Sequence, residues 1–423
     1  MPGTCIHPGI QKCRRHPAVI FYLNIRLGLM IAVKLLFCLF FIYLAISITY
    51  LLVIALAGRF GKLPSYTFNA YKKKIAVIIP SYKEDAVIID TALKASQHNY
   101  PKDRYTVLVV ADKLQPETVM QLRQVPVQVL EADVNMKSRS VHAALHYLDE
   151  NNFDIAVILD ADNIMGDGCL EKINDAFMRG CEAVQCHRTA KNQQTAVALL
   201  DAISEEININ LFRRGPVVMG ISAAPVGSGM AFTFPLLKQI FSVEQILTNP
   251  GEDREIDMQL MKQGIFMHYI DDAYVYDEKV SNAGVFEKQR VRWLEAQLNH
   301  IKRFFDADMK NVPKTIVYYA KFFHNLLLPR LLLIMVLGLL FILLTVQWLF
   351  SFNMLMPAPA WWLQLIIMYA VVLILSVPAR FYSVNTLKAV SQVPVLMISM
   401  MKALLKMKTG RKEFIHTPKT FKP

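Results

Sequence analysis

Short apolar runs separated by helical patterns characterise the middle of the chain, between residues 72 and 305. The apolar runs, which are rich in β-branched residues, cover residues 75–79, 105–110, 127–130 and 155–159, and helical periodicity occurs near 86–98, 116–124 and 138–149. Such runs predict buried strands, and strands that alternate with helices predict βαβ units in a mostly parallel sheet. We therefore expect an α/β fold for this segment.

Much longer apolar stretches lie on both sides of that segment. Residues 35–57 carry no charge between Lys34 and Arg59, and no charge interrupts residues 331–379. A helix of about 20 apolar residues crosses a bilayer. A cleaved secretory signal is the alternative for the first stretch, but its apolar run is too long and no small-residue cleavage site follows. We expect an N-terminal tail at 1–30 and transmembrane helices at 31–58, 327–350 and 361–379.

The two ends of the chain leave alternatives open. Residues 384–408 contain a proline and several lysines, and predict either an amphipathic helix in the membrane interface or a third C-terminal crossing. Residues 409–423 form a basic tail that we expect in the cytosol. Translation starts at Met1 or at Met30. From Met30 only Lys34 would precede the first crossing, and the positive-inside rule would then place the following domain in the cytosol.

The hydrophobic and basic excess of the chain is localised. Hydrophobic residues make up 54% of the 423 positions, the net charge is +12, and the basic residues gather near the apolar segments. Because no nucleic-acid motif is present, an anionic membrane surface and an anionic substrate explain the charge better than nucleic acid does. The six cysteines form no disulfide framework or zinc-ligand spacing, which indicates reduced thiols in a cytosol-facing domain.

Polar side chains follow the predicted strands. Asp160 and Asp162 come where the strand at 155–159 should end, and residues 80–84 and Asp112 follow two earlier strands. In a strand, residues i and i+2 face the same side, so the two aspartates are predicted to face one cation. Carboxylate oxygens suit Mg²⁺ or Mn²⁺, whose shell is commonly completed by substrate phosphates and water. In such sheets ligands bind beyond the carboxyl ends of the strands.

Further charged residues fit the chemistry of a diphosphate leaving group. Lys137 precedes a predicted helix, and Arg290 and Arg292 offer bidentate contacts to phosphate oxygens. Asp253 is the candidate general base that takes a proton from an acceptor hydroxyl. Direct displacement needs this base opposite the leaving group, so base and metal site must be separate carboxylates. Helix capping at Asp253 and a solvated basic helix face at 289–292 are the ordinary alternatives.

These residues occur in an order that resembles the membrane-integrated family 2 glycosyltransferases, which include cellulose, chitin, hyaluronan and poly-N-acetylglucosamine synthases. In chain order the motifs are Pro80-Ser81-Tyr82-Lys83-Glu84, Asp112, Lys137, Asp160-Ala161-Asp162, Gly251-Glu252-Asp253 and Gln289-Arg290-Val291-Arg292-Trp293, and the tail at 414–419 resembles a closing segment of such synthases. The resemblance covers residues 72–420. It implies a Rossmann-like GT-A catalytic domain at 72–305 on the cytosolic face, with flanking transmembrane helices in the plasma or inner membrane.

The resemblance also implies a role for each matching residue. It implies a uridine pocket of Tyr82, Glu84 and Asp112, and a donor diphosphate bound by Lys137, Asp160, Gln289, Arg290 and Arg292. It implies that the metal is bound by Asp160 and Asp162, and the acceptor by Gly229, Glu252 and Trp293. The base implied by the resemblance is Asp253. The sequence departs from the family pattern at Ala111-Asp112-Lys113-Leu114, where many relatives carry a second polar residue beside the aspartate.

The function expected from these features is inverting transfer of a hexosyl or N-acetylhexosaminyl group. The donor would be a UDP-sugar, and the acceptor a growing β-linked polysaccharide at the cytosolic membrane face. Two alternatives remain open: transfer of a single sugar to a lipid-linked acceptor, and a catalytically retired membrane partner subunit. With so few membrane helices, polymer export would involve accessory membrane subunits or a homo-oligomer.

Overall fold

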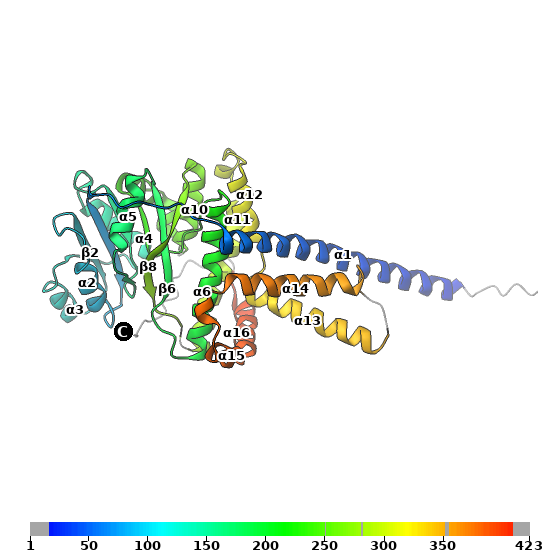
Figure 1. Cartoon of the computed structure of the whole chain (residues 1–423). Coiled ribbons are helices and arrows are strands. Elements are labelled where there is room, and N and C mark those ends of the chain that lie inside the picture. Colours follow the sequence, from blue (N-terminus) through cyan, green and yellow to red (C-terminus); the bar gives the residue numbers. More distant parts are fainter. Residues whose placement is uncertain (1–16, 250, 281, 352–354, 409–423) are drawn as a thin grey trace, which may run out of the picture. The chain divides into compact units, whose positions relative to one another are not determined.

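The computed structural model describes residues 17–249, 251–280, 282–351 and 355–408, and contains an eight-stranded sheet (Figure 1). The strand order is β3-β2-β1-β4-β7-β6-β8-β5. The strands are β1 (Ile75–Tyr82), β2 (Tyr105–Asp112), β3 (Gln128–Ala132), β4 (Ile155–Ile158), β5 (Ile164–Met165), β6 (Ala183–Ala190), β7 (Met230–Thr233) and β8 (Met267–Asp277). All four strands expected from the sequence are present.

The sheet is parallel in its first half and mixed in its second. Strands β3, β2, β1 and β4 are parallel, whereas β7 pairs antiparallel with both β4 and β6, and β5 pairs antiparallel with β8. The expectation of a mostly parallel sheet therefore holds for the strands that the sequence predicted. The register of β1 and β2 sets Tyr82 directly opposite Asp112, so their carboxyl ends are level.

Helices cover both faces of the parallel strands because successive side chains of a strand point to opposite sides. Ile75, Val77 and Ile79 of β1 are buried under α2 (Ile88–Ser96), α3 (Pro116–Leu122) and α5 (Cys169–Met178). Ala76 and Ile78 are buried on the other face under α4 (Lys137–Tyr147), α8 (Phe234–Phe241) and α10 (Glu252–Gln263). This two-sided burial explains the continuous apolar runs in the sequence.

The other helices of the unit that contains the sheet lie between β6 and β8 in the chain or after β8. They are α6 (Ala196–Ile209), α7 (Gly215–Val218), α9 (Glu244–Thr248), α11 (Ala283–Arg303), α12 (Ile316–Leu326), α15 (Val384–Val390) and α16 (Val393–Lys406). Short 3₁₀ turns occupy Glu150–Asn152, Ala307–Met309 and Ala379–Phe381. A π-helical segment, η2 (Asn210–Arg214), joins α6 to α7. Such segments are frequent at functional sites.

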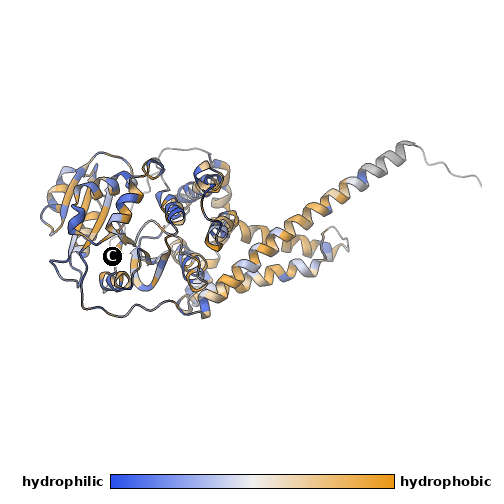
Figure 2. Cartoon of the chain, turned by 90° about the horizontal axis from the view of Figure 1, so that it is seen from above, coloured by the Kyte–Doolittle hydropathy of each residue, from blue (hydrophilic) through white to orange (hydrophobic). Residues whose placement is uncertain are grey.

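Three helices are long and apolar enough to cross a membrane: α1 (Pro17–Phe60, with its candidate span at Gly28–Phe60), α13 (Arg330–Leu349) and α14 (Pro359–Ser376). Hydrophobic residues predominate along these helices, whereas the helices beside the sheet carry both hydrophobic and hydrophilic residues (Figure 2). Helix α1 begins at Pro17, so residues 17–30, which we expected in a tail, are helical. The reason is that adding residues to an existing helix is far easier than nucleating one. The expected tail at 409–423 and its motif at 414–419 lie outside the described residues.

The chain divides into two compact units. One consists of the described parts of Tyr50–Val336 and Ala370–Pro423 and contains the whole sheet. The other consists of the described parts of Met1–Thr49 and Leu337–Tyr369. In this second unit Trp362 is 1% exposed and packs edge-on against Phe41, with their ring centroids 5.1 Å apart.

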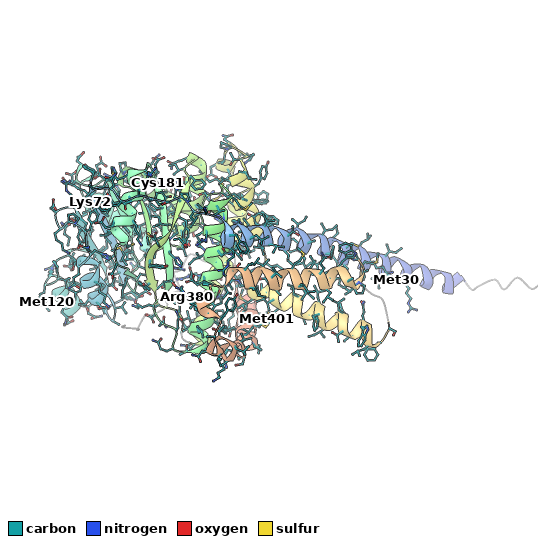
Figure 3. The ribbon with its side chains drawn as sticks, in the orientation of Figure 1. Met30, Lys72, Met120, Cys181, Arg380 and Met401 are labelled. Carbon is teal, nitrogen blue, oxygen red and sulfur yellow. The ribbon has the colours of Figure 1, made fainter. Side chains whose placement is uncertain are left out.

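Helices α15 and α16 belong to the unit that contains the sheet and meet at a bend of 45°. Helix α15 packs on α6, and α16 packs on α11, where Met400 and Ala403 bury Val291 and Leu294. The other face of α16 is exposed and apolar at Ile398, Met401 and Leu405 (Figure 3 labels Met401). Helix α16 therefore has one face packed on α11 and an opposite apolar face that is exposed.

Candidate active site

The ends of three parallel strands each carry a residue in the left-handed region: Lys83 (φ 55°), Lys113 (φ 56°) and Asn135 (φ 58°). Backbone conformations of this kind are uncommon outside glycine and cluster at functional sites. After β1, the Glu84 carbonyl accepts the N–H of Ile88 at the start of α2, and the Lys83 ammonium lies 5.2 Å from the Tyr82 ring centroid. Tyr82 and Glu84 are both half-buried at this edge.

Asp112 is fully buried and holds the loop that precedes α4. Its two carboxylate oxygens accept the backbone N–H groups of Val134 and Asn135 at 3.3 and 2.7 Å. Burial raises the pKa of Asp112, and these two hydrogen bonds oppose the rise. These contacts hold the loop that leads to Lys137, where α4 begins, and the expected contact of Asp112 with uridine stays a prediction.

Lys137 brings together residues from four separate segments. Its ammonium lies 2.5 Å from Asp160 Oδ1 and 3.0 Å from Glu252 Oε1, and donates to the Gly227 carbonyl at 2.5 Å. Burial alone would lower the pKa of Lys137, but the two carboxylates outweigh it and raise the pKa, so the group is cationic. Three residues predicted from separate motifs therefore meet at one point, which we call the Lys137 cluster (Lys137, Asp160, Gly227 and Glu252).

The two aspartates of the Asp-x-Asp motif lie on a turn and not on a strand. Strand β4 ends at Ile158, so strand alternation does not place them on one side, as we had reasoned from the sequence. The Asp160 side chain is 30% exposed, whereas Asp162 is 5% exposed. The turn is held by the Asp160 N–H, which donates to Ser228 Oγ at 3.0 Å, and by the Lys191 ammonium, which donates to the Asp162 carbonyl at 2.9 Å.

This donor set is consistent with a divalent ion that also binds substrate. Among the described residues, no group of three or more His, Cys, Asp or Glu side chains gathers to hold a metal ion. An all-protein cage is thus not formed by that part of the chain. Mg²⁺, however, is commonly held by one or two carboxylates together with substrate phosphates and water. Asp160 and Asp162 as the ligands of such an ion stay a prediction.

Asp253 stands beside the Lys137 cluster at the start of α10. It is the second residue of the helix, directly after Glu252, and is half-buried. Its Oδ1 accepts the Arg254 N–H at 2.9 Å. Burial lowers the pKa of Arg254, and the nearby negative charge of Asp253 opposes that shift. The helix start thus presents the Glu252 carboxylate to Lys137 and holds the Asp253 carboxylate as a separate group, and the role of Asp253 as the base stays a prediction.

The loop at 225–229 requires glycine. Gly227 and Gly229 have φ values of +83° and +65°, and a Cβ atom on Gly229 would lie 2.9 Å from Val275 Cγ2. Glycine alone meets both conditions without strain. The Gln185 amide donates to the Ser228 carbonyl at 2.9 Å, and its oxygen accepts the Val226 N–H at 3.0 Å. The loop that supplies the Gly227 carbonyl to Lys137 is therefore fixed along its length.

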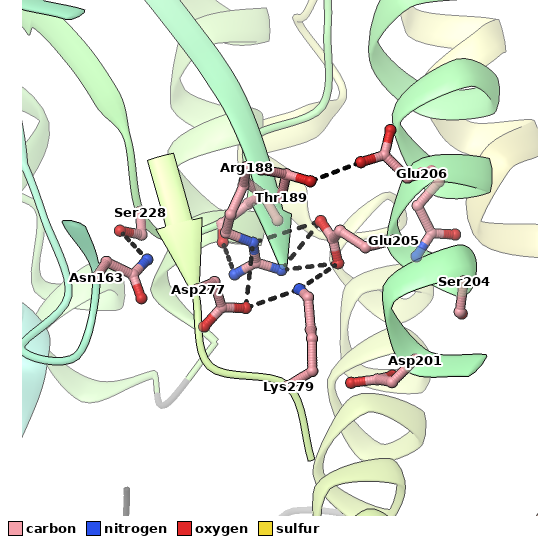
Figure 4. Close-up of polar contacts among 12 residues, drawn as sticks. Asn163, Arg188, Thr189, Asp201, Ser204, Glu205, Glu206, Ser228, Asp277 and Lys279 are labelled. Atoms are coloured by element: carbon pink, nitrogen blue, oxygen red, sulfur yellow. Dashed lines mark hydrogen bonds and ion pairs between the residues drawn. The ribbon is translucent and has the colours of Figure 1, made fainter. Parts of the chain in front are cut away.

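A buried cluster of four charges, missed in the sequence, lies behind this loop (Figure 4). Arg188 donates to Glu205 Oε2 at 3.1 Å and to the Val226 carbonyl at 3.1 Å, and Lys279 lies 2.9 Å from Asp277 Oδ2. Burial would raise the pKa of Glu205, but Arg188 and Lys279 lower it to about 2. Glu205 is thus ionised, and the Arg188 cluster (Arg188, Glu205, Asp277 and Lys279) holds loop 225–229 against α6.

A second buried network surrounds His187. The imidazole lies 3.3 Å from Glu206 Oε2 and 3.4 Å from Asp271 Oδ1, and Arg380 donates to the other Glu206 oxygen at 2.5 Å. Burial alone would lower the pKa of His187. The hydrogen bonds to Asp271 and Glu206 outweigh burial and raise the pKa to about 9.

The pKa of His187 predicts a loss of stability in mild alkali. Because its folded pKa of about 9 lies above its ordinary value of 6.5, the charged imidazole stabilises the fold fully below pH 6.5. That contribution, on the order of 3 kcal/mol, is lost as the pH rises through 9. The unfolding temperature of the protein in lipid should therefore fall between pH 6.5 and 9.

The matched variant is His187→Gln, which cannot titrate. We expect it to have a lower unfolding temperature at pH 6.5 and a much smaller fall towards pH 9. An equally steep fall in the variant would assign the pH dependence to another group.

The motif at 289–293 lies on α11, where its arginine is held by α6. Arg290 donates to Asp201 Oδ1 at 2.6 Å, and its guanidinium carbon lies 4.0 Å from the Trp293 ring centroid. Gln289 Oε1 is buried and has no hydrogen-bond partner among the described residues. Arg292 and Trp293 are half-buried. The structure thus joins Arg290 to Asp201, and not to the Lys137 cluster with which we had grouped it.

A sequence model described as glycosyltransferase-like family 2 matches residues 73–296, more than half of the chain. The chain belongs to this family. No curated protein matches the glycosyltransferase sequence closely. The fold class expected from the sequence, a Rossmann-like GT-A domain accompanied by apolar helices that could span a membrane, is confirmed.

Solved structures resemble this glycosyltransferase in fold at low sequence identity. The mannosyltransferase PcManGT from Pyrobaculum calidifontis, in complex with GDP-Man and Mn²⁺, is 15% identical with a TM-score of 0.51, and the alignment covers 89% of this chain and 98% of that one. S. aureus TarS is 13% identical with a TM-score of 0.38, covering 60% of this chain and 43% of that one. Its 1–349 fragment is 12% identical with a TM-score of 0.40, covering 78% and 91%.

Proposed function

We propose that the protein transfers a sugar from a UDP-sugar onto a growing β-linked polysaccharide at the cytosolic membrane face, with inversion at the anomeric carbon. The observation that carries the proposal is the Lys137 cluster. It places a carboxylate of the Asp-x-Asp turn and a carboxylate at the start of α10 within hydrogen-bond reach of one cation, the Lys137 ammonium. The cation and the Asp-x-Asp carboxylate would serve a diphosphate leaving group. Asp253, beside Glu252 at the start of α10, would serve as the base for an acceptor hydroxyl.

On the donor side, the chain supplies positive charge and hydrogen-bond donors for the diphosphate. Lys137 is cationic and close to Asp160, and Arg292 presents a second cation from α11. Tyr82 ends β1 and Glu84 follows it, and both would border the nucleoside. A Mg²⁺ or Mn²⁺ ion held by Asp160 and Asp162 would neutralise the diphosphate as it leaves.

On the acceptor side, Asp253 would take the proton of the attacking hydroxyl. The hydroxyl oxygen forms a bond to the anomeric carbon on the face opposite the diphosphate, the carbon–oxygen bond to UDP breaks, and UDP leaves. Gly229 and Trp293 would border the acceptor, and Glu252 would hold the start of α10 through Lys137. The buried, unpartnered Gln289 Oε1 is suited to accept a hydrogen bond from a sugar hydroxyl.

The helices favour an integral membrane protein whose catalytic unit lies against the cytosolic face. Helices α1, α13 and α14 would cross the membrane. Helix α16 would lie in the interface and not cross it, because one face packs on α11 and Lys406 pairs with Glu287 of that helix at 2.6 Å. Accessory subunits or further copies of the chain would complete a path for a polymer.

Two other functions remain to be separated by experiment. Transfer of one sugar to a lipid-linked acceptor would use the same donor chemistry and differ in product length. A retired partner subunit is disfavoured, because the base candidate and the charged donor-side residues are retained in the sequence, and Lys137 is paired with Asp160 and Glu252.

The deciding experiment measures UDP release by the purified protein in lipid with Mn²⁺ from a panel of UDP-sugars. GDP-mannose is assayed by release of GDP, because the similar mannosyltransferase structure contains GDP-Man, and release from GDP-mannose alone would contradict a UDP-sugar donor. Release accompanied by a high-mass product supports the proposal. Release with only a lipid-mobile product supports single-sugar transfer. Mn²⁺-UDP binding without release from any donor supports the partner subunit.

Asp162→Ala tests the metal assignment. The substitution removes one of the two carboxylates, so the gain in UDP affinity that Mn²⁺ produces should shrink by about ten-fold or more. Calorimetric titration of UDP with and without Mn²⁺ measures this gain. Asp103→Ala, at an exposed carboxylate far from the turn, should keep the full gain. An undiminished gain in Asp162→Ala would place the ion elsewhere.

A further inference from the structure

We propose that Asp201 and Arg290 are positioning residues that fix the indole of Trp293 at the acceptor side of the site. The inference rests on the proposed function and assigns a new role to both residues. Asp201 belongs to α6 and appears in no motif of the sequence. The motif predicted that Arg290 binds the donor, whereas its contacts favour a role in supporting Trp293.

Arg290 lies between two aromatic rings of its own helix. Phe286, Arg290 and Trp293 are spaced i, i+4 and i+7 along α11 and therefore share one face. The guanidinium carbon lies 4.2 Å from the Phe286 ring centroid and 4.0 Å from the Trp293 ring centroid. Arginine is suited to this position because its planar cation stacks on aromatic faces, which a lysine ammonium does not do in the same way.

Asp201 holds the guanidinium in place from the neighbouring helix. The Arg290 Nη2 to Asp201 Oδ1 distance is 2.6 Å, and the two side chains are only 10% and 9% exposed. Arg290 Nε is buried and has no hydrogen-bond partner among the described residues. To reach a phosphate, the guanidinium would have to leave Asp201 and both rings. The contacts therefore favour support of Trp293 over a direct contact with the donor.

Helix α6, which carries Asp201, is itself anchored at several points of the same unit. Arg330, the first residue of α13, donates to the Ser204 carbonyl at 3.0 Å and also to the Asn208 side chain. Asn210, at the end of α6, donates to Ser376 Oγ at 3.0 Å, at the last residue of α14. A well-anchored helix can hold an arginine, and through it a tryptophan, in one orientation.

The alternative is that the ion pair only joins α6 to α11. The two roles predict different transfer activities when both residues are replaced by apolar ones. Buried ion pairs can often be exchanged for apolar residues of similar volume without loss of stability. If the pair only joins the helices, the double variant Asp201→Leu/Arg290→Met keeps transfer activity. If it positions Trp293, the double variant folds but transfers poorly. Arg290→Lys keeps a positive charge for Asp201 and loses the planar stack.

The test uses the full chain in lipid nanodiscs, labelled with 5-fluorotryptophan, with the Trp293 resonance assigned through Trp293→Phe. Mn²⁺-UDP binding reports on the donor side, and UDP release with product formation reports on transfer. We expect Arg290→Lys and the double variant to shift the Trp293 resonance, to bind Mn²⁺-UDP within about two-fold of wild type, and to lower transfer at least about ten-fold. Arg303→Lys is the control, because it makes the same change on the same helix at an arginine paired with Glu255. It should leave the Trp293 resonance, Mn²⁺-UDP binding and sugar transfer unchanged.

Three results would overturn the proposal. They are an unshifted Trp293 resonance in both variants, wild-type transfer by a folded double variant, and a loss of UDP affinity in Arg290→Lys that matches its loss of transfer. If the double variant does not fold, Arg290→Lys alone decides. If the wild type releases UDP from no donor, the proposed function fails, while the fluorine resonance still shows whether the pair fixes the indole.

Discussion

Replacing Asp253 by asparagine is expected to lower sugar transfer by between about 10² and 10⁴-fold, while Mn²⁺-UDP binding stays within about two-fold of wild type. Asparagine has nearly the same shape but cannot take the proton of an attacking hydroxyl. Asp253 bonds the Arg254 N–H, whereas the neighbouring Glu252 pairs with Lys137, so the substitution spares the donor-side contacts. Transfer is measured as UDP release with the active donor, and binding by calorimetric titration.

Glu244→Gln is the matched control, because it makes the same chemical change at an exposed carboxylate on α9. It should transfer sugar like the wild type. A parallel loss of UDP binding in Asp253→Asn would show that the carboxylate supports the donor pocket, and the assignment of the base would then pass to another group.

The sequence predicted the parallel half of the sheet because those strands are buried on both faces. Ile75 to Ile79 and Ile155 to Leu159 read as continuous apolar runs, since helices cover both sides of them. The second half was not predicted for a physical reason. Strand β7 has four residues and β5 has two, and both depend on pairing with distant segments, β6 and β8. Local pattern carries little information about such strands.

The candidate site was predicted residue by residue, but its arrangement was not. Lys137, Asp160 and Glu252 were each singled out. Lys137 and Asp160 come together because they follow parallel strands that end at one edge of the sheet, whereas Glu252 comes from the start of α10, which follows no parallel strand. Arg188 and Asp201 were missed because their partners lie far away in sequence; Asp201 is 89 positions from Arg290. The structure shows Arg188 as the only Lys, Arg, Asp or Glu in the eight-residue strand β6, whose positions are mostly buried.

The supporting charges explain why the site depends on residues outside the motifs. Arg188 binds the Val226 carbonyl, and the next residue, Gly227, gives its carbonyl to Lys137. Arg188 is held in turn by Glu205 of α6, and the same helix holds Arg290 through Asp201. One helix thus supports both Lys137 and Trp293, the residues that we propose for the donor and the acceptor, so under this proposal a displacement of α6 would disturb the binding of both substrates.

Lys137→Met is expected to weaken Mn²⁺-UDP binding by about 10- to 100-fold and to lower transfer by at least as much. A hydrogen bond from a charged group contributes about 1.5–3 kcal/mol, and each 1.4 kcal/mol is about ten-fold in affinity. The variant should also be less stable. Asp160 and Glu252 now share a cation, and in the variant these two half-buried carboxylates would face each other without one. Unfolding temperature and UDP affinity are therefore measured on the same sample.

A second variant separates the two effects of Lys137. In Lys137→Met/Glu252→Gln one of the uncompensated carboxylates is gone, so the unfolding temperature should recover while UDP affinity stays low. Lys238→Met, which breaks an exposed pair with Glu150, serves as the control and should bind UDP normally. Recovery of UDP affinity together with stability would mean that Lys137 supports the fold of the site and makes no contact with the diphosphate. Persistent loss of affinity in a restored fold assigns the ammonium to the donor.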